Sequence, residues 1–269
     1  LNENSPVAPY LPPDWFKGPG VINLKFGELL GHTSGLSSYN TNFSRTLTWS
    51  GLRRMIDTGV VRNKNYQYLN ANFALFRVII PAMWKGMPGA PNLGTLDSAS
   101  TEQLYIQYMQ EKIFEPIGLT NIDCEDEARS VATLYYATTD LQVNSGVYYG
   151  SWTNMAGGGG FYMSTVELAK VLAYYRHTET LLSKTSRQTM EANRYGYERE
   201  DNNLEIRGSY FPKNGSISNT SGQGVVTQVV CFPNGVEVTV VFNTQGMVFA
   251  GGQTNIRIAL YDAYNKSWE

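Results

Sequence analysis

The spacing of apolar residues divides the chain into a helix-rich first part and a sheet-forming last part. The apolar run from Ala71 to Met83 has large apolar side chains at helical intervals from Phe73 onward, which predicts a helix over 71–83 with one buried face. We interpret the aromatic residues of that face as core. The same reasoning predicts further helices over 26–30, 49–57, 183–192 and 254–264.

Two further helices are predicted from their starting residues. Ser100 is followed three positions later by Gln103, and Ser164 is followed in the same way by Glu167. This spacing is typical of a capping box, in which each side chain bonds to the backbone N–H of the other. We therefore expect helices to begin at these serines, the first running to about Phe114.

The last third of the chain predicts an antiparallel sheet. Sheet structure is expected to begin over 204–211, and the two strands 225–232 and 236–242 are joined by Pro233-Asn234-Gly235. Asn-Gly between apolar runs is a strong hairpin signal. In the second of these strands, valines alternate with polar residues, which indicates a half-buried strand.

Composition narrows the classes of function. The chain has 269 residues, a net charge of −2 and only 16% charged residues, so no basic stripe points to nucleic acid. No apolar run is long enough to span a membrane. Two histidines 145 positions apart and no Cys-x-x-Cys make a zinc site unexpected, and no motif calls for a cofactor. Cys124 and Cys231 either pair or remain buried thiols, and the second is favoured.

Tyr68-Leu69-Asn70 carries the most chemistry. The phenol of Tyr68 can shuttle a proton, and the carboxamide of Asn70 can hold a polar substrate group. The alternative is a helix start with an ordinary asparagine, because Tyr-x-Asn is common. Ser34, in Gly31-His32-Thr33-Ser34-Gly35, is one place late for a hydrolase elbow, so we reject it as a nucleophile. His32 is interpreted as a structural hydrogen-bonding residue.

The order of four motifs resembles the penicillin-recognising serine hydrolases, which include class C β-lactamases, D-Ala-D-Ala peptidases and related esterases. These motifs are Leu29 to Leu36, Tyr68 to Asn70, Gly157 to Leu168 and Lys213 to Gly215. The resemblance implies an α+β, β-lactamase/transpeptidase-like fold, with an antiparallel sheet flanked by helices and a helical subdomain. Within it, residues 1–20 are expected to form an extended Pro-rich connector, 21–200 the mostly helical subdomain, and 201–269 the strands and C-terminal helix.

The resemblance also implies roles for individual residues. Tyr68 takes the proton-shuttle role, and Lys213 supplies a cation that favours the tyrosinate and attracts anionic substrate. Asn70, Asn214 and Gly215 are expected to bind substrate. Asn214 stands where the family has threonine or serine. Gly215 would let a substrate backbone lie close to the strand.

One motif of that family, Ser-x-x-Lys, is not found at any of the 19 serines. We therefore expect a chain that lacks the N-terminal nucleophile segment and part of the sheet, with an exposed sheet edge. Three hypotheses follow. The first is a serine hydrolase that acts on amide, lactam or ester carbonyls and takes its nucleophile from another segment or chain. The second is an inactive relative that binds peptide, peptidoglycan or protein, and the third is an assembly module. Composition and resemblance favour an extracytoplasmic location.

Overall fold

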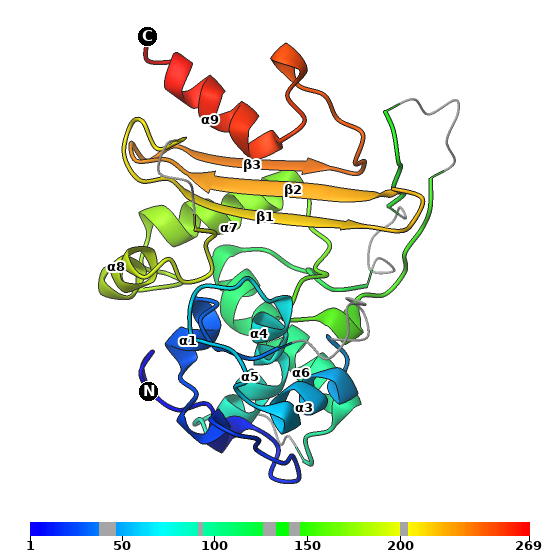
Figure 1. Ribbon diagram of the computed structural model, residues 1–269, viewed down its shortest axis with the longest axis vertical. Helices are drawn as coiled ribbons and strands as arrows, with labels where there is room; N and C mark the ends of the chain where they lie inside the picture. The colour runs from blue at the N-terminus through cyan, green and yellow to red at the C-terminus, as the bar shows by residue number, and fades with distance from the viewer. Residues whose placement is uncertain (38–46, 91–93, 126–132, 140–145, 200–203) are drawn as a thin grey trace. The chain divides into compact units, whose positions relative to one another are not determined.

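The computed structural model describes residues 1–37, 47–90, 94–125, 133–139, 146–199 and 204–269, and divides into two compact units (Figure 1). Unit 1 comprises residues 1–128 and 151–162, and unit 2 comprises 129–150 and 163–269. Residues 163–199, which include two helices, group with the strands in unit 2. Unit 1 is helical, whereas unit 2 contains the strands.

Unit 1 is built around helix α5, and its elements follow the apolar spacing closely. Its principal helices are α1 (Phe26–Leu30), α3 (Trp49–Thr58), α4 (Asn70–Ala74), α5 (Phe76–Lys85) and α6 (Ser98–Met109). The single helix expected over 71–83 is interrupted at Leu75, which separates α4 from α5. Against α5 and α6 pack Cys124, Ala156 and Phe161.

The first twenty residues contain more structure than an extended connector. They include a 3-10 helix at Ala8–Tyr10, and Val7, Leu11 and Trp15 are almost fully buried. The backbone N–H of Val7 donates to Leu24 O, which joins this segment to the chain just before α1. Proline limits helix length here but leaves short turns whose apolar side chains can enter the core.

Helix α6 begins earlier than its predicted cap. Asp97, and not Ser100, is the N-cap: its side chain accepts from Ser100 N at 2.9 Å, and Ser100 Oγ accepts from Asp97 N at 2.8 Å. The prediction that Ser100 caps the helix is therefore wrong by three residues. The helix continues as a π-helical segment at Gln110–Phe114 and a 3-10 turn at Glu115–Ile117.

Unit 2 contains a three-stranded antiparallel sheet in its described residues, in the order β1-β2-β3. The strands are β1 (Phe211–Ser218), β2 (Gly224–Cys231) and β3 (Glu237–Phe242). The predicted Asn-Gly turn joins β2 to β3, with Phe232 N donating to Val236 O. The first strand begins at Phe211, so the expectation of sheet structure from Leu204 is wrong.

Helices cover both faces of this sheet (Figure 1). On one face, Val230 and Val238 pack with Tyr261 of α9 (Ile256–Lys266). On the other, Val229 and Cys231 pack near α7 (Thr165–His177) and α8 (Lys184–Ala192). Alternation along β2 and β3 thus produces the two buried faces, as the period of two requires.

The start of α7 and the state of the two cysteines were also predicted. Ser164 and Glu167 form the expected capping box at the start of α7. His177 ends that helix, and its Nε2 is 2.7 Å from Glu237 Oε2 on β3. Cys124 and Cys231 are both buried and form no disulfide, which confirms the favoured alternative.

Candidate functional site

Tyr68 and Asn70 contact each other at the surface of unit 1. The phenol of Tyr68 donates to Asn70 Oδ1 at 2.8 Å, and 42% of Tyr68 is exposed. Asn70 is the first residue of α4, and Leu69 before it is extended. The carboxamide of Asn70 therefore accepts from Tyr68 through its oxygen and can donate to a substrate through Nδ2. The two predicted residues thus meet because they are only two positions apart in the chain.

Side chains of the loop that begins at His32 bond to the residues next to this pair. His32 Nδ1 accepts from Leu69 N at 3.1 Å and lies 3.4 Å from Asn72 Nδ2. Ser34 Oγ donates to Asn72 Oδ1 at 2.8 Å, and all three of these polar side chains are buried. This geometry agrees with the interpretation of His32 as structural, and it gives Ser34 Oγ a buried hydrogen-bonding role rather than that of an exposed nucleophile.

The glycine run that follows in the sequence packs beneath the same helices. Gly157 has φ of 88°, and a β-carbon there would lie 3.0 Å from Phe73 O and 3.3 Å from Arg77 N. The partners in this close backbone packing are α4 and α5. The glycine thus lets the chain approach the helices that carry Asn70.

Lys213, Asn214 and Gly215 lie in the middle of strand β1 in unit 2. They pair with Val229, Gln228 and Thr227 of β2, in that order. A β-carbon at Gly215 would lie 2.6 Å from Thr227 Oγ1, so any larger residue here would require the Thr227 side chain to shift. Within the described sheet β1 is an edge strand, and an edge leaves backbone groups that an extended peptide can pair with.

An acidic side chain accompanies the predicted cation. Lys213 Nζ is 3.5 Å from Glu198 Oε1, and Glu198 Oε2 is 3.7 Å from Arg257 Nη1 on α9. Glu198 is 12% exposed and its N–H donates to Pro212 O at the edge of β1. Partial burial of this carboxylate strengthens its attraction for both cations. The prediction did not include Glu198 or Arg257, because only the folded strand edge brings them to Lys213.

The structure therefore assembles the predicted residues in two sets. Tyr68 and Asn70 lie together in unit 1, and Lys213, Asn214 and Gly215 lie together in unit 2. That the two sets share one cleft stays a prediction. Asn72 was missed, although a polar residue inside the apolar run 71–83 is itself a signal of a buried hydrogen-bond partner.

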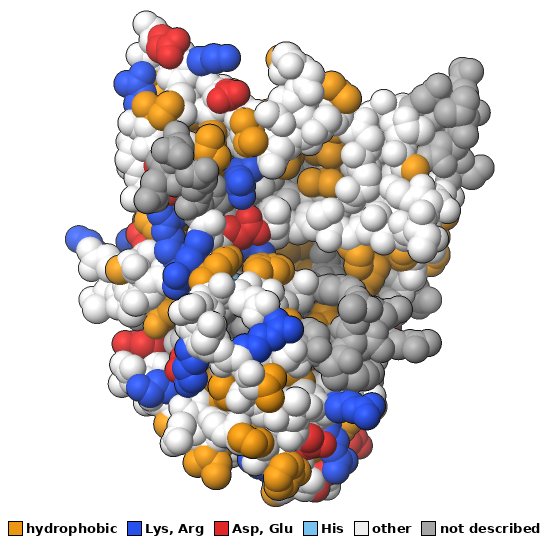
Figure 2. All heavy atoms as spheres, in the orientation of Figure 1, with side chains coloured by type: hydrophobic (Ala, Val, Ile, Leu, Met, Phe, Trp, Pro, Cys, Tyr) orange, Lys and Arg blue, Asp and Glu red, His pale blue; other side chains and the backbone are white. Residues whose placement is uncertain are grey.

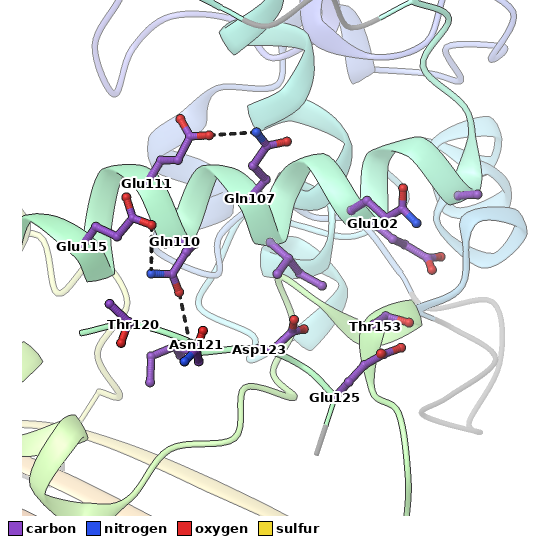
Figure 3. Close-up of a pocket in the computed structure, with 14 residues that line it drawn as sticks. Glu102, Gln107, Gln110, Glu111, Glu115, Thr120, Asn121, Asp123, Glu125 and Thr153 are labelled. Atoms are coloured by element: carbon purple, nitrogen blue, oxygen red, sulfur yellow. Dashed lines mark hydrogen bonds between the residues drawn. The ribbon is translucent and has the colours of Figure 1, made fainter. Parts of the chain in front are cut away.

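A separate cleft of about 800 Å³ lies along α6 in unit 1 (Figure 3). None of the five predicted residues lines it. Its labelled carboxylates bond to neighbours: Glu111 accepts from Gln107 at 2.7 Å, and Glu115 accepts from Gln110 at 3.4 Å. Gln110 also accepts from Ile122 N at 3.1 Å, so it ties the two walls of the cleft together.

No group of three or more His, Cys, Asp or Glu in the described ranges is arranged to hold a metal ion. Within those same ranges, no helix is long and apolar enough to cross a bilayer. On the face drawn in Figure 2, acidic side chains lie among the basic ones.

Comparison with known proteins identifies the class. A model of the Beta-lactamase family matches residues 1–263. The chain therefore belongs to the Beta-lactamase family, a family of serine hydrolases, and its helices and small antiparallel sheet form a β-lactamase-like fold. A comparison with curated protein sequences gave no match.

Solved structures show the same fold. The chain is similar to a class C β-lactamase from Rhodobacter sphaeroides, with TM-score 0.60, 16% identity, and coverage of 100% of this chain and 79% of that one. A β-lactamase from Sulfitobacter sp. EE-36 is similar with TM-score 0.57 and 13% identity, and the match covers 99% of this chain and 77% of that one. SurE with D-Leu is similar with TM-score 0.55 and 14% identity. That match covers 90% of this chain and 54% of the other, so the chain spans about half of that protein.

Proposed function

We propose that this chain forms part of an acyl-transferring serine hydrolase that acts on amide, lactam or ester carbonyls. The observation that carries the proposal is the pair formed by Tyr68 and Asn70. A phenol at the surface, held by a neighbouring carboxamide on a buried polar support, is suited to moving a proton beside a bound carbonyl compound. Membership of the Beta-lactamase family supports the same class of chemistry.

In this mechanism Tyr68 relays a proton. A serine oxygen bonds to the carbonyl carbon, and its proton passes to the Tyr68 oxygen. At the same time the phenol proton leaves its bond to Asn70 Oδ1 and passes to the departing nitrogen or oxygen, whose bond to the carbonyl carbon breaks. Water later attacks the acyl-enzyme and restores the serine. Asn70 binds the substrate amide through Nδ2, since its Oδ1 is turned toward Tyr68.

Lys213 supplies the positive charge in the proposal. An ammonium group at the substrate site would attract an anionic substrate. Because Glu198 lies 3.5 Å from Lys213 and binds Arg257 as well, it neutralises part of that charge. We therefore infer a moderate preference for anionic over neutral substrates. Asn214 and the edge of β1 are proposed to bind the substrate backbone.

The serine nucleophile is proposed to come from outside these 269 residues, because none of the 19 serines has Ser-x-x-Lys spacing. Reading the gene upstream of Leu1 for an in-frame Ser-x-x-Lys is the first step. The test is covalent labelling with a fluorescent penicillin and a fluorophosphonate. We expect no label on the 269-residue chain, and label on a form extended to include the motif.

Variants of the extended form test the assigned roles. Tyr68→Phe should slow labelling by about 100-fold or more, because a general base typically contributes that much. Tyr66→Phe is the matched control, since Tyr66 lies edge-on to the same His32 ring, and it should change the rate little. Lys213→Ala should slow the anionic penicillin more than a neutral ester. Equal rates for Tyr68→Phe and the parent would refute the proton-shuttle role.

A binding function is the second candidate, and the absence of Ser-x-x-Lys from the sequence favours it. In that case the chain binds peptide or peptidoglycan at the same residues without turnover. Failure of every form to label, together with saturable binding of a D-Ala-D-Ala peptide that Asn70→Ala weakens, would replace the hydrolase proposal with this one. We also propose an extracytoplasmic location, which the weakly charged composition supports.

A further inference from the structure

His32 adopts a backbone conformation that its side chain alone does not favour. Its φ is 53°, in the left-handed region that glycine, asparagine and aspartate occupy most readily. The residue is also only 2% exposed. A glycine would relieve the backbone strain at this turn. The histidine side chain must therefore provide interactions that compensate for it.

Those interactions converge on the segment that carries Tyr68 and Asn70. Backbone N–H groups and amide nitrogens can only donate, so His32 Nδ1 accepts from Leu69 N and Asn72 Nδ2 and the ring carries its proton on Nε2. The carbonyl of His32 also accepts from Gln67 N at 2.8 Å. One residue thus fixes the chain on both sides of Tyr68.

The ring of His32 contacts the Tyr68 ring directly. Their centroids are 4.5 Å apart with the planes tilted by 39°, and Phe73 lies against the same imidazole at 5.1 Å. The Tyr68 side chain is therefore oriented at both ends: its ring lies on His32, and its oxygen donates to Asn70. An otherwise half-exposed tyrosine would sample several rotamers in the absence of these contacts.

We propose that His32 is a positioning residue for the reaction, one that aims the Tyr68 phenol through a hydrogen bond to Leu69 and a ring contact. The inference rests on the proposed function of Tyr68. His32 does not itself exchange a proton with substrate. Its effect is to convert a flexible surface phenol into one that is held in a single direction, which is how bound geometry contributes to rate.

Two substitutions separate the hydrogen bond from the ring. His32→Asn keeps an acceptor, because Asn Oδ1 is bonded to Cγ as His Nδ1 is, and asparagine tolerates a positive φ. His32→Phe keeps a ring and loses the acceptor. Where His32→Phe does not fold, His32→Gly serves, since glycine relieves the strain and lacks both ring and acceptor. Ser34→Ala is the matched control, because it removes a buried hydrogen bond to Asn72 without touching Leu69 or the Tyr68 ring.

The first readout is nuclear magnetic resonance of the 269-residue chain, which needs no catalysis. Amide exchange at Leu69 should accelerate by about tenfold in His32→Phe or His32→Gly, as loss of one hydrogen bond predicts, and stay near the parent rate in His32→Asn. Ring signals of Tyr68, assigned with Tyr68→Phe, should move in every His32 variant. Ser34→Ala should leave both readouts unchanged. Unchanged signals in His32→Phe and His32→Gly, or equal changes in Ser34→Ala, would overturn the proposal.

The second readout is the labelling rate of the form that contains Ser-x-x-Lys. His32→Phe, or His32→Gly in its place, should lower the rate of covalent labelling by about tenfold or more with the concentration for half-maximal rate little changed, and His32→Asn should recover most of it. Labelling at the parent rate in a variant whose Tyr68 signals have moved would also overturn the proposal. Absence of labelling in the parent would refute the proposed function instead, and the resonance experiment would still decide whether His32 orients Tyr68.

Discussion

The buried guanidinium of Arg77 predicts a measurable coupling inside unit 1. Arg77 lies on α5 with none of its side chain exposed, and its Nη1 is 3.5 Å from Glu102 Oε1 on α6. It also donates to the carbonyls of Leu47 and Asn154. Burial lowers the pKa of Arg77, and the charge of Glu102 raises it again in part. Glu102 is thus the counter-charge that makes a buried cation tolerable.

The perturbation is a double-mutant cycle with Glu102→Gln and Arg77→Met. At 3.5 Å and an effective dielectric constant of about 20, the attraction is about 5 kcal/mol before desolvation is subtracted. Glu102 is 19% exposed, so Glu102→Gln should lower the free energy of unfolding by about 2–3 kcal/mol, below the range for a fully buried pair. Arg77→Met should cost about 3–5 kcal/mol, because two carbonyls also lose their donor.

Urea unfolding of the four proteins at pH 7 measures the cycle. The loss in the double variant should be smaller than the sum of the single losses by about 2 kcal/mol, because the buried charge that Glu102 compensates is gone. Glu111→Gln is the control: its carboxylate is more exposed and pairs with Lys112 at 3.6 Å, so it should change stability by less than about 1 kcal/mol. Additive losses would refute the argument that Glu102 stabilises Arg77.

Two further predictions concern stability. Burial raises the pKa of Cys231 and of Tyr175 to about 12 each, from 9.0 and 10.0. Because the folded state keeps protons that the unfolded chain loses, the urea midpoint should be constant below pH 9 and should fall between about pH 9 and 12. Cys231→Ala should remove about 2 kcal/mol of the stability loss at pH 10.5. Gly157→Ala should lower the free energy of unfolding by about 1 kcal/mol or more beyond the loss in Gly89→Ala. Both glycines have φ near 80°, but only a β-carbon at Gly157 would contact backbone, at Phe73 O. Equal losses in thermal or urea unfolding would contradict this.

Helices were predictable where a local pattern had a single solution. The periodicity of 26–30 and the Ser164–Glu167 box correspond to α1 and to the start of α7. The start of α6 was not predictable in this way, because Asp97 and Ser100 each have a suitable partner three residues later and only one of them can be the N-cap. In the structure Asp97 is the N-cap, and it and Ser100 bond reciprocally. A charged acceptor at a helix N-terminus is favoured by the helix dipole as well.

Strand β1 illustrates the opposite case. Its sequence from Phe211 to Ser218 contains proline, asparagine and glycine, which are depleted in strands, and it has no clear alternation of apolar residues. It is a strand because β2 pairs with it along its whole length. The partner of Lys213 is Val229, 16 positions away, so local patterns place Lys213 beside a sheet and not within it. Glu198 reaches Lys213 for the same non-local reason.

The half of the candidate site that lies in unit 1 is encoded by polar residues at positions where apolar ones would be simpler. Asn72 interrupts an apolar helical face, and His32 accepts a strained φ in a turn where glycine would fit. The two side chains contact each other, and His32 Nδ1 also accepts from the backbone of Leu69. A sequence selected for stability alone has no reason to keep this arrangement, because local rules that are broken and repaired elsewhere tend to mark functional sites. The cost is explained if the orientation of Tyr68 matters, which is why the His32 variants test function more directly than the fold does.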